Sequence, residues 1–354
     1  MNNLRESPLK MKNMNIENIT EDEAALYDRQ IRLWGLDAQK RLRAARVLLA
    51  GVCGLGAEVA KNLVLSGVKS LVLLDHRTVT EVEIHSNFLA PHDSVGKNIA
   101  EASQERTQIL NPMVQVTADS SNIVDKTTEF FTQFDVVCVT RCRQDELIRI
   151  NDICRQNKII FFAGDVFGMF GYMFADLQEH QYVEEVKERK PVEHNGKKQI
   201  VEETKVVKQT ENFVPLSQAL DIDWTSKKYS GQMRRISPAY FIMQIIMEFI
   251  SLHGRNPDRS HQEEDEMELL TIKNALLEKL NVPAEKVSNQ FAGGDFSFVF
   301  IRIVFGQLSP VCAIVGGVLA QEIIKAVSQK DLPHNNFFFF STLDGAGVVE
   351  CIGH

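Results

Sequence analysis

The chain lacks several features that define large classes of protein. It has no excess of basic residues: 39 lysines and arginines stand against 47 acids, and the net charge of -8 argues against general binding to nucleic acid. Its six cysteines include no CxxC pair, which disfavours both a disulfide framework and a zinc site built from paired ligands. We therefore expect free thiols in a reducing compartment.

A signal sequence and a long apolar run are also missing. Met1–Asn18 is polar, so we expect no signal peptide. The apolar stretch Val311–Leu319 contains Gly316-Gly317 and is too short to cross a bilayer. With 354 residues, 44% of them hydrophobic, the chain can form a large core, which suits two domains or one domain with an insertion.

Strand and helix patterns alternate through the first half of the chain. Short apolar runs predict strands, and the stretches between them have helical spacing. Thr20 can cap the first helix, with Glu23 as its reciprocal partner. Strands separated by helices are typical of an α/β fold, and we predict a doubly wound, mainly parallel Rossmann-like sheet. The predicted strands are 46–50, 70–74, 114–118, 135–140 and 158–163.

Composition divides the chain into further segments. Residues 1–20 are polar and predict a flexible N-terminus, and 21–180 form the first part of the α/β domain. Residues 181–212 are rich in both acidic and basic side chains and have few large apolar ones. That composition favours a charged linker or loop, disordered at least in part, over the alternative of a charged surface hairpin.

The last third of the chain is apolar again. Residues 213–290 predict a mostly helical insertion, and 291–354 complete the α/β domain. We expect a small-residue helix from Pro310 and a buried aromatic strand at 336–341 with a hairpin partner. The strongly apolar stretch 296–305 is open to three interpretations: core, an interface strand, or a sequence variant that something must cover.

The segment Arg46–Asp75 has the order of a nucleotide-binding unit. A strand leads into a glycine-rich turn, a helix, a second strand and the acid Asp75. In such units the glycines let the backbone approach phosphates, and the acid binds a ribose hydroxyl. The turn carries Gly51, Gly54 and Gly56, but Cys53 stands where a bare backbone is needed. We therefore favour a retained fold with an impaired nucleotide pocket over a working dinucleotide site.

Five ordered blocks resemble the activating enzymes of ubiquitin-like proteins, which have a ThiF/MoeB-like adenylation domain. The nine-residue segment YDRQIRLWG is similar to their N-terminal signature, and the block at Pro333–Phe340 is similar to the smaller, non-catalytic subunit in the SUMO branch of the family. The resemblance runs from about residue 20 to the end and is weak at 181–212 and 289–308. The blocks are Tyr27–Gly35, Gly56–Leu63, Phe161–Gly171, Ser309–Ala320 and Pro333–Phe340.

The resemblance implies a reaction shared by two subunits. The catalytic subunit binds ATP and Mg²⁺, and the terminal carboxylate of the modifier attacks the α-phosphate to give an acyl-adenylate and pyrophosphate. A cysteine thiolate then takes the acyl group as a thioester. On this resemblance the present chain is the non-catalytic half of an obligate heterodimer. The larger subunit supplies the ATP site, the thioester cysteine and the zinc site, and SUMO is the modifier.

By the same resemblance, the chain has lost the charged groups of an active site. Active members carry a second acid, an Asn-Arg pair, a lysine and a magnesium-binding aspartate. The matching positions here are Arg77, His85, Ser86, Ile99 and Cys142. A site without these charges cannot stabilise the negative charge that builds on the α-phosphate. The resemblance therefore implies that Gly51, Gly54, Gly56 and Asp75 line a degenerate pocket that stays unoccupied.

Arg29 is the one catalytic residue that the resemblance assigns to this chain. In the family, the N-terminal arm of one subunit completes the site of the other, so Arg29 would reach ATP bound in the partner. A guanidinium suits this role, since it is always charged and can bond two phosphate oxygens. The alternative for Arg29 is a surface salt bridge on a helix. We interpret Arg32, three residues on, as a packing or ion-pair residue.

Cys142 is a further candidate, because Arg141 and Arg143 flank it and could lower the pKa of its thiol. A catalytic thiol there is the less favoured interpretation, and an incidental residue in an inactive pocket is preferred. Cys53 and Cys138 are expected in the core. We expect no metal in this chain.

Four functions compete at this point. The resemblance favours the SUMO-activating heterodimer and the nucleus, with the cytoplasm as a second location. The corresponding subunit of the NEDD8-activating enzyme would be a longer chain. An independent nucleotide-binding Rossmann enzyme is disfavoured by Cys53 and by the missing charges. A pure scaffold differs from the first hypothesis only in giving no role to Arg29.

Overall fold

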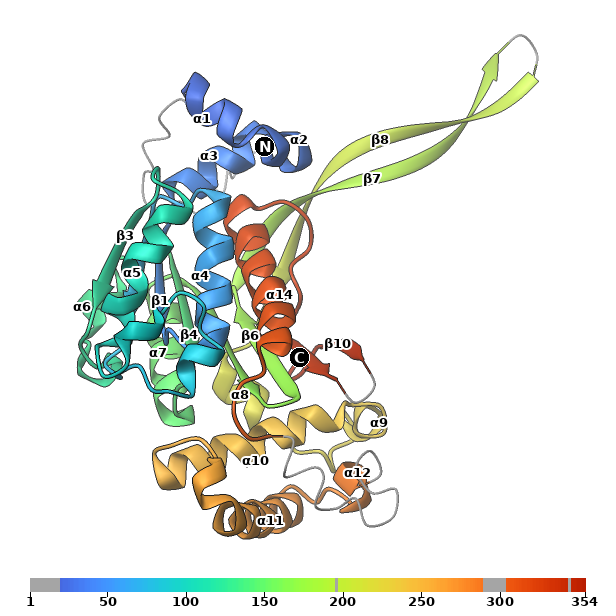
Figure 1. Cartoon of the computed structure of the whole chain (residues 1–354). Coiled ribbons are helices and arrows are strands. Elements are labelled where there is room, and N and C mark those ends of the chain that lie inside the picture. The colour runs from blue at the N-terminus through green and yellow to red at the C-terminus, as the bar shows by residue number, and fades with distance from the viewer. Residues whose placement is uncertain (1–19, 195–196, 289–303, 343–344) are drawn as a thin grey trace.

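A computed structural model describes residues 20–194, 197–288, 304–342 and 345–354. At its centre lies an eight-stranded sheet of order β10-β9-β6-β5-β4-β1-β2-β3 (Figure 1). The parallel part consists of β1 (Arg46–Ala50), β2 (Ser70–Leu74), β3 (Gln115–Asp119), β4 (Val136–Thr140) and β5 (Ile160–Phe167). Three antiparallel strands continue it: β6 (Phe170–Asp176), β9 (Phe337–Ser341) and β10 (Ala346–Glu350). The predicted doubly wound, mainly parallel sheet is confirmed.

Helices cover both faces of this sheet and bury two separate apolar clusters. One layer holds α3 (Leu36–Ala44), α4 (Gly54–Ser66), α5 (Ile99–Leu110) and α14 (Ser309–Ser328). The other layer includes α6 (Thr128–Phe131), α7 (Gln144–Gln156), α8 (Leu216–Leu220) and α10 (Pro238–His253). Because both faces are covered, β1 and β4 are almost fully buried, which is why they read as continuous apolar runs.

The N-terminal arm consists of α1 (Glu21–Leu26) and α2 (Asp28–Trp34), which lead into α3. Thr20 and Glu23 form the predicted capping box at the start of α1. In Figure 1 the arm lies at the end of α4 that is opposite the glycine-rich turn. The arm and the turn are therefore joined through the length of one helix.

The charged segment 181–212 is not an irregular linker. It forms an antiparallel hairpin of β7 (Glu179–His194) and β8 (Lys197–Asn212), which projects away from the body of the molecule (Figure 1). Its base is joined to the end of α14, because the Val183 N–H donates to the Gln329 carbonyl over 3.0 Å and the Asp331 N–H donates to the Val183 carbonyl. The linker prediction was wrong because a two-stranded ribbon outside the core needs no apolar face, so its composition resembles that of a loop.

Residues 213–290, expected to be mostly helical, contain α8, α9 (Ser230–Met233), α10, α11 (Gln262–Lys279) and α12 (Glu285–Ser288). The short 3₁₀ helices are η1 (Glu83–His85), η2 (His92–Ser94), η3 (Ile123–Asp125) and η4 (Arg259–His261). Phe337–Phe340 are buried in β9, as predicted. Most of the N-terminal segment 1–20, for which flexibility was predicted, and most of the apolar stretch 296–305 lie outside the described residues; Val304 and Phe305 are buried.

Among the described residues, α14 alone is long and apolar enough to pass a test for a membrane span. About two thirds of its apolar window, 67%, is buried inside the protein. A Cβ on Gly316 would lie 2.6 Å from the Glu58 Cβ of α4, so the glycine allows the two helices to pack closely. These contacts make α14 a core helix of the α/β domain, as its position in Figure 1 illustrates.

Candidate functional site

The glycines of the turn between β1 and α4 are required by packing inside the protein. Gly51 has a φ of +93°, and a Cβ there would lie 2.2 Å from the carbonyl oxygen of Thr140. A Cβ on Gly56 would lie 2.0 Å from the Gly51 carbonyl oxygen. The Cys53 side chain is buried, with its Sγ 3.5 Å from the Thr140 hydroxyl. The turn therefore keeps its shape without needing a phosphate to explain its glycines.

Two backbone donors that would face phosphates are already used within the chain. The Val52 N–H donates to the Asp75 carboxylate over 2.8 Å, and the Gly54 N–H at the start of α4 donates to the Gln307 side-chain oxygen over 3.0 Å. The N-terminus of a helix normally attracts an anion. Here a side-chain amide of the same chain takes that position. Gln307 was not recognised from the sequence, because it is separated from Gly54 by 253 residues.

Asp75, the ribose-type acid, is also engaged. Its carboxylate is 4% exposed and forms a bidentate pair with Arg77, with N–O distances of 2.9 and 2.6 Å. Burial alone would raise the pKa of Asp75, but the Arg77 guanidinium and hydrogen bonds outweigh it and leave the pKa below its usual value. An acid held in this way has little capacity left for a ribose hydroxyl.

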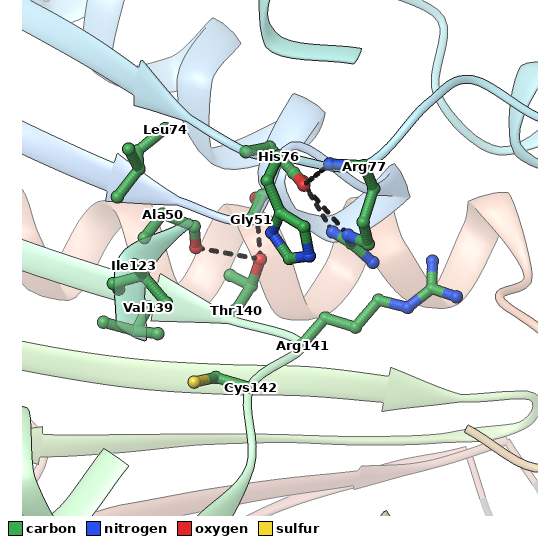
Figure 2. A pocket seen from close by; sticks show the side chains of 11 residues that line it. Ala50, Gly51, Leu74, His76, Arg77, Ile123, Val139, Thr140, Arg141 and Cys142 are labelled. Atoms are coloured by element: carbon green, nitrogen blue, oxygen red, sulfur yellow. Dashed lines mark hydrogen bonds and ion pairs between the residues drawn. The ribbon is translucent and has the colours of Figure 1, made fainter. Parts of the chain in front are cut away.

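The space that remains at the ends of β1, β2 and β4 is small. It has a volume of about 40 Å³, whereas ligand pockets typically reach about 300 Å³ or more. Figure 2 shows His76, Arg77 and Arg141 along one side of it. Its lining residues are Ala50, Gly51, Leu74, Asp75, His76, Arg77, Ile123, Val139, Thr140, Arg141 and Cys142.

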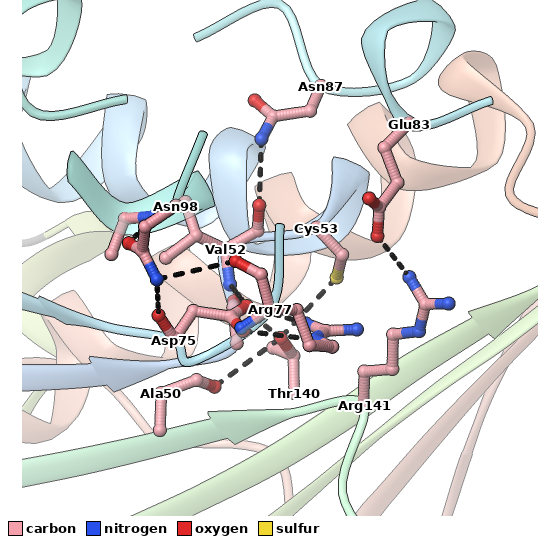
Figure 3. Close-up of polar contacts among 12 residues, drawn as sticks. Ala50, Val52, Cys53, Asp75, Arg77, Glu83, Asn87, Asn98, Thr140 and Arg141 are labelled. Atoms are coloured by element: carbon pink, nitrogen blue, oxygen red, sulfur yellow. Dashed lines mark hydrogen bonds and ion pairs between the residues drawn. The ribbon is translucent and has the colours of Figure 1, made fainter. Parts of the chain in front are cut away.

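The loop after β2 lies over the glycine turn. Asn87 donates to the Val52 carbonyl over 2.7 Å, and Arg141 forms an ion pair with Glu83 at 2.8 Å (Figure 3). Three positions that match catalytic residues of active family members lie close by. His85 and Ser86 are in this loop, and Ile99 is fully buried at the start of α5. The ion pair of Arg141 with Glu83 therefore connects this loop to the end of β4.

Cys142 is not an activated thiol. Burial, with a further contribution from Glu146, raises the pKa of Cys142 to about 12. The flanking Arg141 and Arg143 do not reverse this, because Arg141 pairs with Glu83 and Arg143 pairs with Asp145. The suggestion that these arginines lower the pKa of the thiol is wrong, and the neutral thiol that dominates at pH 7 is a poor nucleophile.

Asp165 is a buried acid that sequence analysis missed as part of this site. It lies in β5, is 2% exposed, and accepts hydrogen bonds from the Val166 N–H at 2.7 Å and from the Gln307 amide at 3.1 Å. Burial raises the pKa of Asp165 to about 6, although Arg141 and Arg77 act in the opposite direction. Asp165 thus holds the amide that caps α4.

We expect Asp165→Asn to remove a pH dependence of stability. Because the folded pKa of about 6 lies above the usual 3.8, the folded state binds this proton more tightly, and stability should fall as the pH rises from about 4 to about 6. Asn can accept the same two hydrogen bonds and does not ionise. The variant should be more stable than the parent by ~2 kcal/mol at pH 7. Urea unfolding at several pH values measures this; parallel curves for the two proteins would contradict it.

The arm places Arg29 in a different setting. Arg29 is exposed on α2, and among the described residues it makes no hydrogen bond or ion pair. Arg32 on the same helix pairs with Asp28 at 3.0 Å, as expected for an ion-pair residue. Leu26 and Leu33, three residues before and four residues after Arg29, are 56% and 71% exposed. Arg29, without a partner among the described residues, therefore lies between two exposed leucines on the outer surface of the arm.

Comparisons of this chain with known proteins all indicate one family. Residues 27–351 match the ThiF family. The SUMO-activating enzyme subunit 1 of Xenopus laevis is 50% identical over 343 residues, which cover 95% of this chain and 97% of the relative. Proteins of the same name from Homo sapiens and Danio rerio are 48% and 49% identical and cover 95% and 94% of the chain.

Proposed function

The chain belongs to the ThiF family, and we propose that it is the non-catalytic subunit of a heterodimeric SUMO-activating enzyme. The relatives that carry this name match it over nearly their whole length. In this function the chain is part of an ATP-dependent ligase-type enzyme that adenylates the C-terminus of SUMO. The modifier then passes as a thioester to a cysteine of the larger subunit. We place the complex in the nucleus, with the cytoplasm as a second location.

The single observation that supports assigning ATP binding to the partner subunit is the state of this chain's own pocket. Its phosphate-facing N–H groups bond to Asp75 and Gln307, and its acid pairs with Arg77. The volume of about 40 Å³ is far below what a nucleotide needs. These facts support a partner subunit that binds ATP and Mg²⁺. We assign the zinc site to that partner as part of the same proposal.

The second part of the proposal concerns Arg29, which would reach the phosphates of ATP bound in the partner. Its support is the outer surface of the arm, where the Arg29 guanidinium has no partner in the part of the chain that the structure describes and lies between exposed Leu26 and Leu33. Apolar contacts that exclude water around an arginine are typical of energetically important interface positions. An arginine supplied in trans can stabilise negative charge on a reacting phosphate.

Neither alternative receives comparable support. No relative described above is named as a subunit of the NEDD8-activating enzyme, and the chain matches 95–97% of the length of the SUMO-activating relatives. An independent Rossmann enzyme would need an open nucleotide pocket, but the phosphate-facing N–H groups of this turn are already bonded.

We expect the isolated chain to show no ATP–pyrophosphate exchange with SUMO, because the two arginines of its pocket, Arg77 and Arg141, are already paired with carboxylates and its phosphate-facing N–H groups are already bonded. Adding the larger subunit should restore exchange. The measurement compares this chain alone, the partner alone and the equimolar mixture, each with SUMO and with NEDD8. Robust exchange by the chain alone would refute the proposal, and exchange by the complex with NEDD8 only would favour the alternative.

A further inference from the structure

The C-terminal end of α4 is a meeting point for distant parts of the chain. The last carbonyl groups of a helix have no partner within that helix. In α4 side-chain amides donate to three of them, and the helix ends at Gly67 in the left-handed conformation, with a φ of +79° and its N–H donating to the Val64 carbonyl. The amides of Asn111, Gln30 and Gln39 donate to the carbonyls of Val64, Leu65 and Ser66 over 2.9, 3.0 and 2.9 Å.

Tyr27 occupies the centre of this meeting point. Its side chain is buried against Gly67, where an added Cβ would lie 2.5 Å from the tyrosine ring. Its hydroxyl accepts a hydrogen bond from the Asn111 amide over 2.8 Å, and Asn111 is itself 4% exposed. Burial raises the pKa of Tyr27, so the hydroxyl stays neutral at physiological pH. Asn111 therefore connects Tyr27 to the end of α4 through one amide nitrogen.

These contacts bracket Arg29. Tyr27 precedes it by two residues and Gln30 follows it, and both are joined to the same end of α4. With one attachment on each side, α2 can neither roll nor slide freely on the body. Arg29 itself is exposed on α2, with the exposed Leu33 four residues further along. The attached residues thus fix the place on the surface from which the Arg29 side chain extends.

We propose that Asn111, acting through the Tyr27 hydroxyl, is a positioning residue for Arg29, and this rests on the proposed role of Arg29 in trans. Asn111 lies 84 residues from Tyr27 in the sequence and touches neither ATP nor SUMO in this scheme. Its effect on the reaction comes from the geometry of the arm. A catalytic group displaced by about 1 Å can lose up to ~10²-fold in rate, so a hydrogen bond that limits such movement matters.

The test uses Tyr27→Phe in the complete complex with the larger subunit. Phenylalanine keeps the ring that covers Gly67 and loses only the hydroxyl. We expect kcat for ATP–pyrophosphate exchange to fall about 3- to 10-fold, with KM for ATP changed less than twofold. Asn111→Ala removes the same hydrogen bond from the other side, together with the bonds of Asn111 to Val64 and Met113. It should lower stability more than Tyr27→Phe, but the double variant should show no larger fall of kcat than Asn111→Ala alone.

The effect of Tyr27→Phe on kcat in the Arg29→Ala variant distinguishes a positioning role from a purely structural one. If the hydroxyl acts through Arg29, Tyr27→Phe should have no effect on kcat once the guanidinium is gone, while its effect on the thermal stability of the complex should persist. An equal fall of kcat in both backgrounds would overturn the positioning role and leave the proposed function intact. An Arg29→Ala variant with unchanged exchange would overturn both.

The chain provides a matched control in Tyr240. Its hydroxyl accepts from the Gln244 amide over 2.9 Å and donates to the Ala219 carbonyl over 2.9 Å, so its loss is at least as disruptive as that of the Tyr27 hydroxyl. Tyr240 is buried in the helical insertion, remote from the arm in the fold (Figure 1). Tyr240→Phe should lower thermal stability by a comparable amount and leave kcat within twofold. A fall of kcat in this variant equal to that of Tyr27→Phe would show that general loosening explains the result, and the inference would fail.

Discussion

Replacing Arg29 with alanine should reduce ATP–pyrophosphate exchange by the complete heterodimer roughly 10²- to 10³-fold, because the transition state loses the cation that the proposed function assigns to this chain. The expected loss is in kcat/KM. Assembly should persist, since the exposed leucines on either side of Arg29 are unchanged. Size-exclusion chromatography of the variant complex, followed by initial-rate exchange measurements with SUMO, tests both parts.

Arg32→Ala is the natural control for this experiment. Arg32 lies on the same helix, carries the same charge and is more than three quarters exposed, at 79%, but it pairs with Asp28. An exposed pair of this kind contributes less than about 1 kcal/mol. Exchange by Arg32→Ala should stay within about twofold of the parent. Unchanged exchange in Arg29→Ala would instead favour a scaffold subunit without a part in the chemistry.

The parallel strands could be predicted because their environment is uniform. Val136–Thr140 is buried at every position, so β4 reads as an unbroken apolar run between charged segments. The hairpin of β7 and β8 could not be predicted with the same ease. Its register is set by pairing along the whole length of two strands outside the main sheet, and the sequence has no apolar alternation that marks such pairing.

In the candidate site, too, some residues could be identified from local sequence and others could not. Cys53 in the glycine turn is a local feature that indicates an impaired pocket directly from the sequence, whereas the exchange of an acid for Arg77 is implied by the family resemblance. Gln307 contacts Gly54 of the turn across 253 residues and Asp165 across 142 residues, so no local pattern identifies either side chain as part of the site. The nine-residue signature is a mixed case: it marks the arm, but only the structure separates Tyr27 and Gln30, which hold it, from exposed Arg29.

Arg77→Ala should destabilise the chain by ~3 to 5 kcal/mol at pH 7, because it leaves the carboxylate of Asp75 buried without its counter-ion. Two of the carboxylate's hydrogen bonds come from the Arg77 side chain, and the Val52 N–H replaces neither. Urea unfolding of parent and variant at pH 7 measures the difference in the free energy of unfolding. Arg143→Ala is a matched control, since Arg143 and Asp145 form an exposed pair with the same two-residue spacing. That variant should lose less than about 1 kcal/mol.

The pH dependence of Arg77→Ala has a definite sign. In the parent, the lowered pKa of Asp75 means that its stabilising contribution is present above its usual pKa of 3.8 and is lost as the pH falls through the folded value. In the variant, burial acts without the guanidinium and raises that pKa, so protonation relieves the buried charge. The deficit should therefore be largest near neutral pH and shrink toward pH 4. Adding Asp75→Asn to Arg77→Ala should recover much of the loss at pH 7, because the double variant has no buried charge. A deficit that is constant with pH would show that Arg77 acts through packing of its side chain, and that the acid of this pocket does not depend on it.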